Sequence, residues 1–352
     1  RLDGVTGVQT CALPIFLIVL TLIGLGLSWP AAAQNIKPAE NNDFYDNVPF
    51  KELPFDSIEI AGEVTSPGRL SLKGLPLHQV MVREAVLNGT ETKFIGAYVY
   101  QGYSLFDILK DQILAKKNKD QFSSPIDLMV IVENKKGEKV IFSWGEIFYP
   151  TVLHRQIIGV KVAPIIPSST GETWPLPTNP KIVAANDLFS ERNLDSPVKI
   201  TVKSFPLAMA TEKGKKPLFS PQIKIYIKGE EKGSLDKLPQ DLLILNLPAV
   251  FFGRGQGFHG VNYFQGVPLR LVLEKYLGSQ PINYRTAHLI IIGDDGYRAV
   301  YTASEIFNRN DNQETIICDR GQQNGGRFSL FSIGDFFSDR AVKAIKEIRF
   351  IE

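Results

Sequence analysis

The chain has 352 residues, of which 44% are hydrophobic and 22% are charged, a composition that is typical of globular proteins and excludes disordered and collagen-like chains. It carries 39 basic and 37 acidic side chains, so its formal net charge is only +2. This small charge excludes the broad basic surface that nucleic-acid binding requires, and we expect no nucleic-acid partner. At roughly 150 residues per domain, the length predicts about two domains.

The N-terminal segment, residues 1–33, has the features of a secretory signal peptide. Phe16–Leu27 is an apolar run without charge, and Ala31–Ala33 supplies the small residues of an A-x-A cleavage site. The run is shorter than the roughly 20 apolar residues that span a bilayer, and nothing after Gln34 reaches that length. We therefore expect a periplasmic or secreted bacterial protein without a transmembrane span in the mature chain, with a retained N-terminal anchor as the open alternative. Residues 1–15 resemble translated sequencing-adapter read-through and are expected to be non-native.

The rest of the chain contains one pattern twice. Three blocks recur in the same order at offsets of 164, 159 and 148 residues, pairing Tyr100–Leu109 with Phe264–Leu273, Glu133–Phe148 with Asp294–Phe307, and Asp187–Arg192 with Asp335–Arg340. The shrinking offset places the extra residues of the first copy at Pro164–Pro180, where five prolines predict a surface loop. We predict a polar extension at 34–56, a first domain at 57–203, a linker at 204–221 and a second domain at 222–352.

Each copy is predicted to contain a strand, an irregular segment, a short helix, a strand, a hairpin, a second strand, another short helix and a closing strand. Leu105–Lys110 is expected to be the first helix of its copy with Ser104 as N-cap, and Pro268 suits the start of the matching helix. Asp295-Gly296 predicts a tight hairpin turn. Mixed strands and short helices in this order predict an α+β fold in two tandem domains.

The cysteines and histidines predict no metal site. Once the N-terminal segment is removed, Cys318 is the only cysteine, so neither a disulfide nor a cysteine-based metal cluster is expected. Its strand-like surroundings favour a buried core residue over a reactive thiol. The four histidines, His78, His154, His259 and His288, lack the spacing of zinc motifs.

The motifs of the repeat resemble the molybdopterin-binding domain of the sulfite oxidase type. The second copy fits best, through the motifs at Gln265–Leu273, Asp295–Arg298, Glu305–Phe307 and Gly334–Arg340. The resemblance implies that fold in both copies and, in the family, molybdenum held by a pterin and by a cysteine thiolate upstream of the first helix. The corresponding stretches here, Val80–Gly89 and Leu243–Gly253, contain no cysteine. We therefore expect that the protein binds no cofactor, and we keep molybdopterin as the alternative.

The most unusual local sequence is the glycine-rich segment Phe252–Gly260. Glycines let backbone N–H groups approach an anion such as a phosphate, and Arg254 and His259 add charge or hydrogen bonds. A plain loop between strands is the open alternative. The turn motif adds two further candidates, although the Asp-Gly turn accounts for Asp295 by itself. The residues predicted to contact a cofactor are Arg254, Gly255, Gly257, His259, Asp295 and Tyr297.

Two arginines recur at matching positions. Arg192 follows Asp187 in the first copy as Arg340 follows Asp335 in the second. Because both copies keep the pair, we predict an ion pair or cap that the fold itself requires.

These observations leave the enzyme question open. The leading hypothesis is an exported, non-catalytic module that binds a protein partner or a small anionic ligand, because function has to be argued from the site and not from the fold. The alternatives are a molybdopterin-dependent oxidoreductase of the sulfite oxidase type and a structural component of the cell envelope.

Overall fold

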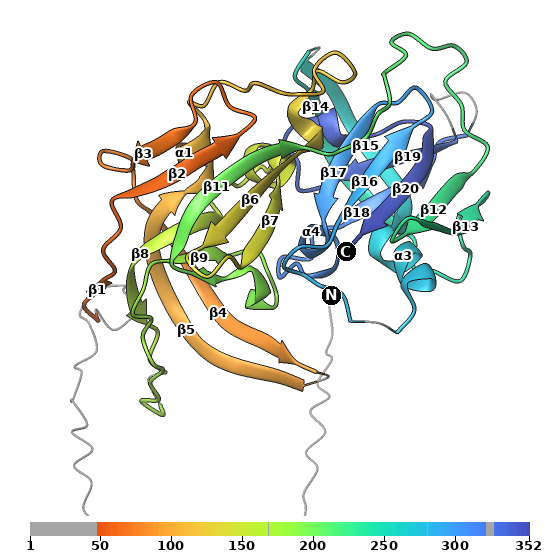
Figure 1. Cartoon of the computed structure of the whole chain (residues 1–352). Coiled ribbons are helices and arrows are strands. Elements are labelled where there is room, and N and C mark those ends of the chain that lie inside the picture. Colours follow the sequence, from red (N-terminus) through yellow and green to blue (C-terminus); the bar gives the residue numbers. More distant parts are fainter. Residues whose placement is uncertain (1–47, 90, 168, 256, 280, 322–326) are drawn as a thin grey trace, which may run out of the picture. The chain divides into compact units, whose positions relative to one another are not determined.

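The structure, a computed structural model, is mostly β (Figure 1). It describes residues 48–352 except 90, 168, 256, 280 and 322–326, so the predicted signal peptide lies outside the described residues. The prediction of an α+β fold is wrong. Within the described ranges the longest helix, α3 (Leu269–Leu277), has nine residues, and the other α-helices have five each. The five-residue helices have little more than one turn each and lie between strands. No helix of the described part is long and apolar enough to cross a membrane.

The first half of the chain forms two sheets. One has the strand order β3-β2-β11-β6-β7, and the other has the order β10-β9-β8-β5-β4, with β1 also paired to β8. All pairs are antiparallel except β2 with β11. The strands are β1 (Lys51–Glu52), β2 (Ser57–Gly62), β3 (Gly68–Ser71), β4 (His78–Asn88), β5 (Glu91–Ser104), β6 (Leu128–Asn134), β7 (Lys139–Ser143), β8 (Gln156–Pro164), β9 (Lys181–Ala184), β10 (Leu194–Asp195) and β11 (Pro197–Ser204). The helices are α1 (Leu105–Leu109), α2 (Trp144–Phe148) and the 3-10 turns η1 (Pro125–Asp127) and η2 (Ser190–Arg192).

The second half repeats this arrangement. Its larger sheet has the order β13-β12-β20-β16-β17, which matches the five-stranded sheet of the first half strand for strand, and its other sheet has the order β14-β15-β18-β19. The strands are β12 (Ile223–Ile227), β13 (Glu230–Leu235), β14 (Leu245–Gly253), β15 (Gly257–Pro268), β16 (His288–Gly293), β17 (Arg298–Thr302), β18 (Thr315–Asp319), β19 (Phe328–Ser332) and β20 (Ile345–Ile351). The helices are α3, α4 (Ala303–Phe307) and η4 (Ser338–Arg340). The order of sheets and helices thus follows the sequence repeat.

Several local predictions are confirmed. Ser104 caps α1 by accepting a hydrogen bond from the backbone N–H of Asp107. The turn between β16 and β17 contains Gly296 at a φ of 78°, as the Asp-Gly motif predicts. No helix or strand lies in the described part of the proline-rich segment between Pro164 and Lys181. The segments predicted to be irregular before each first helix are instead the long hairpins β4–β5 and β14–β15.

The repeated Gln-Gly motif has a steric explanation. Gly102 and Gly266 occupy equivalent positions in β5 and β15, where a neighbouring strand crosses closely. A Cβ atom on Gly102 would lie 2.1 Å from the carbonyl oxygen of Ile158, and one on Gly266 would lie 2.4 Å from that of Ile317. Because real Cβ contacts are never this short, only glycine fits at either position.

The predicted arginine pairs are confirmed as buried ion pairs. The guanidinium of Arg192 donates two hydrogen bonds to the carboxylate of Asp187, at 2.7 and 2.8 Å, and Arg340 does the same to Asp335, at 2.6 and 2.8 Å. Both arginines are at least 96% buried. This bidentate geometry satisfies charges that would otherwise be costly to bury.

The two pairs belong to one network that joins the halves of the chain. Each arginine also contacts the helix-capping glutamate of its own half, Arg192 to Glu146 and Arg340 to Glu305. The N-cap hydroxyls then cross over: Ser143 of the first half donates to Glu305 at 2.6 Å, and Thr302 of the second half donates to Glu146 at 3.3 Å. The residues that the sequence repeats therefore hold the two repeats together.

The buried position of Cys318 predicts an inert thiol. This cysteine lies in β18, is 1% exposed, and packs with Phe264, Ile316 and Phe331. Burial raises the pKa of its thiol to about 12. Since the thiolate is the reactive form, we expect Cys318 to react with a disulfide reagent at least about 100-fold more slowly in the native protein than after denaturation. A spectrophotometric thiol assay with and without denaturant measures this ratio, and equal rates would show that β18 is accessible.

Candidate metal centre

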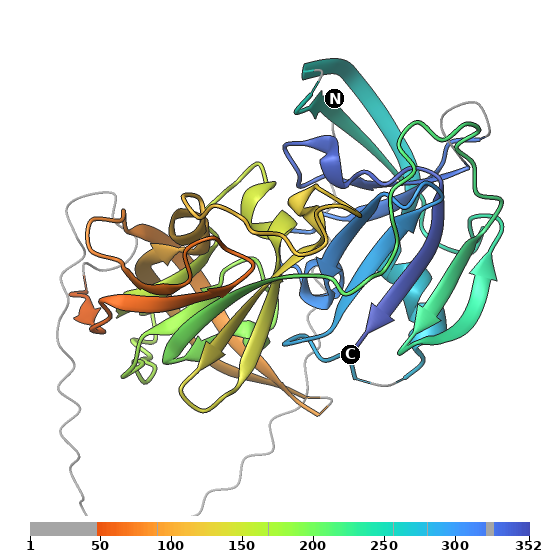
Figure 2. The same ribbon diagram turned by 45° about the horizontal axis from the view of Figure 1, so that its top comes forward.

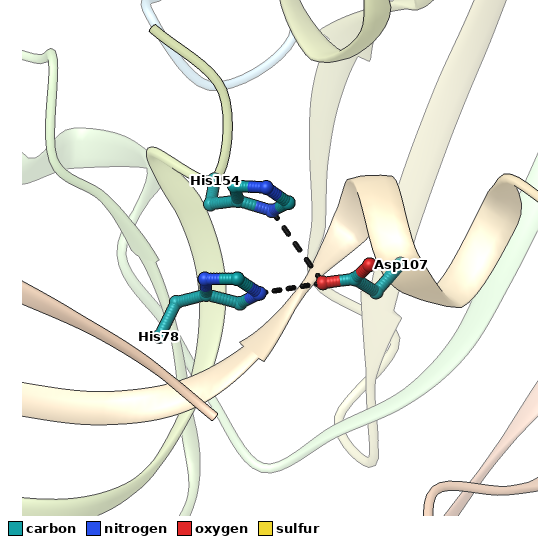
Figure 3. Close-up of side chains that lie close together, drawn as sticks. All are labelled: His78, Asp107 and His154. Atoms are coloured by element: carbon teal, nitrogen blue, oxygen red, sulfur yellow. Dashed lines mark hydrogen bonds and ion pairs between the residues drawn. The ribbon is translucent and has the colours of Figure 1, made fainter. Parts of the chain in front are cut away.

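Two histidines and an aspartate from distant parts of the first half meet beside α1 (Figure 3). His78 is the first residue of β4, Asp107 lies in the first turn of α1, and His154 lies in the loop between α2 and β8. One ligand atom from each residue lies within 4.8 Å of those from the other two. Among the described residues, no other group of three or more His, Cys, Asp or Glu residues has this proximity.

Both imidazoles point at the same carboxylate oxygen. Nε2 of His78 lies 2.6 Å from Oδ2 of Asp107, and Nδ1 of His154 lies 3.4 Å from the same atom. The two rings are stacked, with centroids 3.8 Å apart and planes 5° apart. The imidazoles are partly exposed while Asp107 is buried, so the open side of the cluster is the side of the rings.

The local fold explains why Asp107 stands in this place. Ser104 is the N-cap of α1, and its hydroxyl contacts Oδ2 of Asp107 at 2.8 Å and Nδ1 of His154 at 3.0 Å. Lys110, three residues after Asp107, donates to the other oxygen, Oδ1, at 2.9 Å. Helical spacing thus fixes the carboxylate with Oδ1 toward a lysine and Oδ2 toward the histidines.

The electrostatics favour the metal-binding forms of two members of the cluster, Asp107 and His154. Burial alone would raise the pKa of Asp107, but hydrogen bonds from Lys110, Ser104 and His78 outweigh it and hold this pKa below its ordinary value. Burial, together with the neighbouring His78, lowers the pKa of His154. An ionised carboxylate beside a neutral imidazole is the form in which both groups act as ligands.

A tetrahedral ion would require the ligand side chains to move from the positions that they have here. Metal bonds of about 2.0–2.1 Å place neighbouring ligand atoms of a tetrahedral site roughly 3.4 Å apart. The pair of Asp107 and His154 already has this separation, at 3.4 Å, and the pair of Asp107 and His78, at 2.6 Å, has to lengthen. The imidazoles also have to turn out of their stack, because a metal ion lies in the plane of each ring that binds it. Both imidazole side chains are partly exposed, His78 to 25% and His154 to 29%, which leaves room for this rotation.

The second half keeps the backbone of this site without its ligands. The strand register aligns Leu245 with His78, since each pairs with the glycine of the Gln-Gly motif. Leu271 occupies the position of Asp107 in the matching helix. The offset of 159 residues that relates α2 to α4 and β8 to β18 places Gln313 at the position of His154. The fold therefore does not require the two histidines and the aspartate, which favours a role in function.

The sequence did not reveal this cluster because its members are far apart in the chain. His78 and Asp107 are separated by 29 residues, and His154 lies in another block of the repeat, so no zinc motif connects them. One signal was present. In the otherwise apolar block Leu105–Leu109, Asp107 stands where the matching block has Leu271, and a polar residue at such a position indicates a local role.

The residues predicted from the sequence lie elsewhere, in the second half. Arg254, at the end of the β14–β15 hairpin, donates from its guanidinium to the hydroxyl of Tyr149 at 3.0 Å. His259 packs against Phe251, with ring centroids 5.5 Å apart. Gly255 lies in the turn after β14, and Gly257 is the first residue of β15. The segment is the end of a hairpin, which agrees with the alternative prediction of a loop between strands. Its role in binding an anion stays a prediction.

The other two predicted residues serve the turn between β16 and β17. The carboxylate of Asp295 accepts a hydrogen bond from the backbone N–H of Tyr297 at 3.0 Å, as the turn interpretation predicted. The hydroxyl of Tyr297 donates to the backbone carbonyl of Asp339 at 2.6 Å. Both side chains thus have partners within the protein.

The described residues do not fit molybdenum ligation of the sulfite oxidase type. The stretches that would carry the thiolate form β4 and β14 and contain no cysteine. Cys318 lies inside β18 with its thiol buried and its pKa raised to about 12. A protonated, enclosed thiol is not a metal ligand.

No protein-family model matches the chain, and no curated protein matches it either.

Proposed function

We propose that this protein is an exported, non-catalytic binding module whose ligand is a divalent transition-metal ion, with Zn²⁺ as the preferred metal. The observation that supports this most directly is the convergence of His78, Asp107 and His154, whose ligand atoms lie within 4.8 Å of one another. We thus propose that the binding module takes a cation in its first half, instead of an anion at the glycine-rich segment Phe252–Gly260.

The types of ligand select the kind of metal. Two imidazole nitrogens and one carboxylate oxygen suit Zn²⁺, with Cu²⁺ and Ni²⁺ as competitors, whereas Ca²⁺ and Mg²⁺ prefer sites made of oxygen. Lys110 occupies the second oxygen of Asp107, so the carboxylate offers one oxygen and binds in monodentate fashion. Lys110 orients the carboxylate through its other oxygen, as partners of metal ligands do in other proteins, whereas the hydroxyl of Ser104 contacts the ligand atoms Oδ2 of Asp107 and Nδ1 of His154.

Three protein ligands leave a fourth position for water or another exchangeable group. Since the histidines form the exposed side of the cluster, this position opens toward solvent. The site is therefore suited to taking up and releasing a metal ion in an extracytoplasmic compartment.

Metal titration tests the proposal. Protein stripped of metal with a chelator is expected to bind one Co²⁺ per chain near pH 7.5, with the intense visible absorption of a tetrahedral site, and Zn²⁺ is expected to displace it. Isothermal titration of Zn²⁺ measures the stoichiometry and the affinity. Mg²⁺ serves as the control ion and is expected to give no binding. Folded protein that takes up no Co²⁺ or Zn²⁺ would contradict the proposal.

A further inference from the structure

The hairpin β14–β15 carries an exposed apolar face in the second half of the chain. Its cross-strand pairs are Pro248 with Tyr263, Val250 with Val261, and Phe252 with Phe258. Paired residues of adjacent strands share one face of a sheet, and a bulge between the last two pairs keeps them on the same side. We call this set of six residues the hairpin face. Figure 2 shows the hairpin, in teal, projecting from the second half.

The opposite face of the hairpin is already used. Leu245, Leu247, Ala249, Phe251 and Phe264 pack against the buried side chains of β18 and β19. On the hairpin face, by contrast, Val250, Phe258, Val261 and Tyr263 are between 59% and 71% exposed. Large side chains exposed to this degree on one strand pair mark an interaction surface.

The hairpin is nearly free of charge. Between Leu243 and Pro268 the sequence contains a single charged residue, Arg254, whose guanidinium is engaged by Tyr149. The matching hairpin of the first half, between His78 and Ser104, contains four charged residues: Arg83, Glu84, Glu91 and Lys93. The loss of charge is therefore specific to the second half and is not a property of the hairpin as such.

A groove continues the hairpin face. Pro248, Val250 and Phe252 border a cavity of about 340 Å³ whose other wall includes Phe336 and Phe337. Phe336 is itself half exposed, and its ring lies 5.6 Å from that of Phe252. A cavity of this size has room for a large side chain, which provides a central anchor of the kind that dominates binding energy in interfaces.

We propose that the hairpin face and this groove bind a second copy of the chain, so that two hairpins stack face to face. A surface without free charge can meet its own copy without like-charge repulsion. In this antiparallel hairpin Val250 lies opposite Val261, so a two-fold axis through the face between them relates the two strands approximately to each other. This local symmetry suits a two-fold interface between copies.

The exposed apolar area of the hairpin face and Phe336 is large enough for the interface of a stable dimer. Aromatic side chains bury about 150–250 Å² each, so the exposed parts of Val250, Phe258, Val261, Tyr263 and Phe336 amount to on the order of 500 Å². Homodimer interfaces are about 65% apolar, so an interface with this apolar area has a total buried area of about 800 Å² per partner. This is the area that standard interfaces bury on each side. The dimer is independent of the metal proposal, because its residues lie in the other half of the chain.

Sedimentation velocity of the purified protein tests the dimer. At about 20 µM we expect the wild type to sediment as a dimer, and we expect Val261→Lys to raise the dimer dissociation constant at least about 30-fold, because a lysine on this face loses its hydration on association. Tyr263→Lys is the second variant. Circular dichroism melting curves show that each variant is folded, which an exposed position predicts.

The matched control is Phe94→Lys, an exposed aromatic residue of the charged hairpin β4–β5. It is expected to sediment as the wild type does. A monomeric wild type would overturn the proposal, as would a dimer that survives both substitutions on the hairpin face. A monomer that instead sediments with phosphatidylglycerol vesicles would overturn it in favour of a lipid surface.

Discussion

Replacement of Arg192 by leucine is expected to lower the free energy of unfolding by about 3–5 kcal/mol, which corresponds to a fall in Tm of roughly 10 °C. Arg192 is 1% exposed and is the shared cationic partner of Asp187 and Glu146. Leucine fills much of the space but leaves both carboxylates buried without the guanidinium that forms ion pairs with them. Thermal and urea unfolding, followed by circular dichroism, measure the loss.

Two comparisons identify the cause. Arg69→Leu removes an exposed arginine whose side chain donates a hydrogen bond to Ser57, and we expect it to change stability by less than about 0.5 kcal/mol. The triple variant Arg192→Leu, Glu146→Gln, Asp187→Asn removes the uncompensated charges as well, and it is expected to recover part of the stability. If Arg192→Leu is as stable as Arg69→Leu, the network makes no net contribution to the fold.

The pH dependence of the Arg192→Leu variant has a definite sign. Burial raises the pKa of Glu146 and of Asp187 above their ordinary values even though Arg192 opposes the shift. A carboxyl whose pKa is raised in the folded state stabilises the protein at low pH and loses that contribution as the pH rises through the folded pKa. Without Arg192 the two pKa values are expected to rise further. The deficit relative to wild type should therefore grow as the pH rises above about 7, where Glu146 ionises in the wild type but stays protonated in the variant.

The second large effect concerns the metal centre. The substitution His154→Asn is expected to weaken Zn²⁺ binding at least about 100-fold, because it removes one of three protein ligands. Asparagine tolerates the left-handed backbone of this position (φ 63°), and the matching loop of the second half contains an asparagine, Asn312, in that conformation at a φ of 55°. The variant is therefore expected to fold with a Tm close to that of wild type, so that the loss is one of binding and not of structure.

The affinity for Zn²⁺ is expected to depend on pH in one direction. The pKa of His154 lies below its ordinary value, so this ring is neutral at pH 7 and above, and affinity should be level there. As the pH falls through the lowered pKa of His154, protons compete with the metal for this imidazole and the affinity should fall. Isothermal titrations between about pH 5.5 and pH 8 measure this profile.

The control for this effect is His288→Gln. His288 lies in β16, where its ring contacts the carbonyl oxygen of Thr286, and it has no contact with the cluster. Its variant is expected to bind Zn²⁺ as the wild type does. Unchanged affinity in His154→Asn, or an equal loss in His288→Gln, would contradict the assignment of the site.

The features that the sequence determined by itself are local ones. The turn at Asp295-Gly296, the cap at Ser104 and the strand around Cys318 were predictable, because each depends on the conformational preference of a few neighbouring residues. The repeat added Arg192 and Arg340, since a residue kept in both copies beside the same aspartate indicates a structural pair.

The fold class was not predictable in the same way. The hairpins β4–β5 and β14–β15 contain glycines and bulges that interrupt the alternation of apolar and polar residues, so a strand pattern was not visible there. Their pairing is set by contacts with strands far along the chain, such as β8 and β18. This is why the sequence favoured a mixed fold and the structure is mostly β.

Only the tertiary structure decided which polar residues meet. His78, Asp107 and His154 lie in three separate blocks, and it is the packing of β4 and of the loop after α2 against α1 that brings their ligand atoms within 4.8 Å. The cross-connection of Ser143 with Glu305 and of Thr302 with Glu146 likewise exists only once the two halves are packed together. Spacing along the chain carries no information about such contacts, because the distance between residues of different elements is set by the folding of the chain between them.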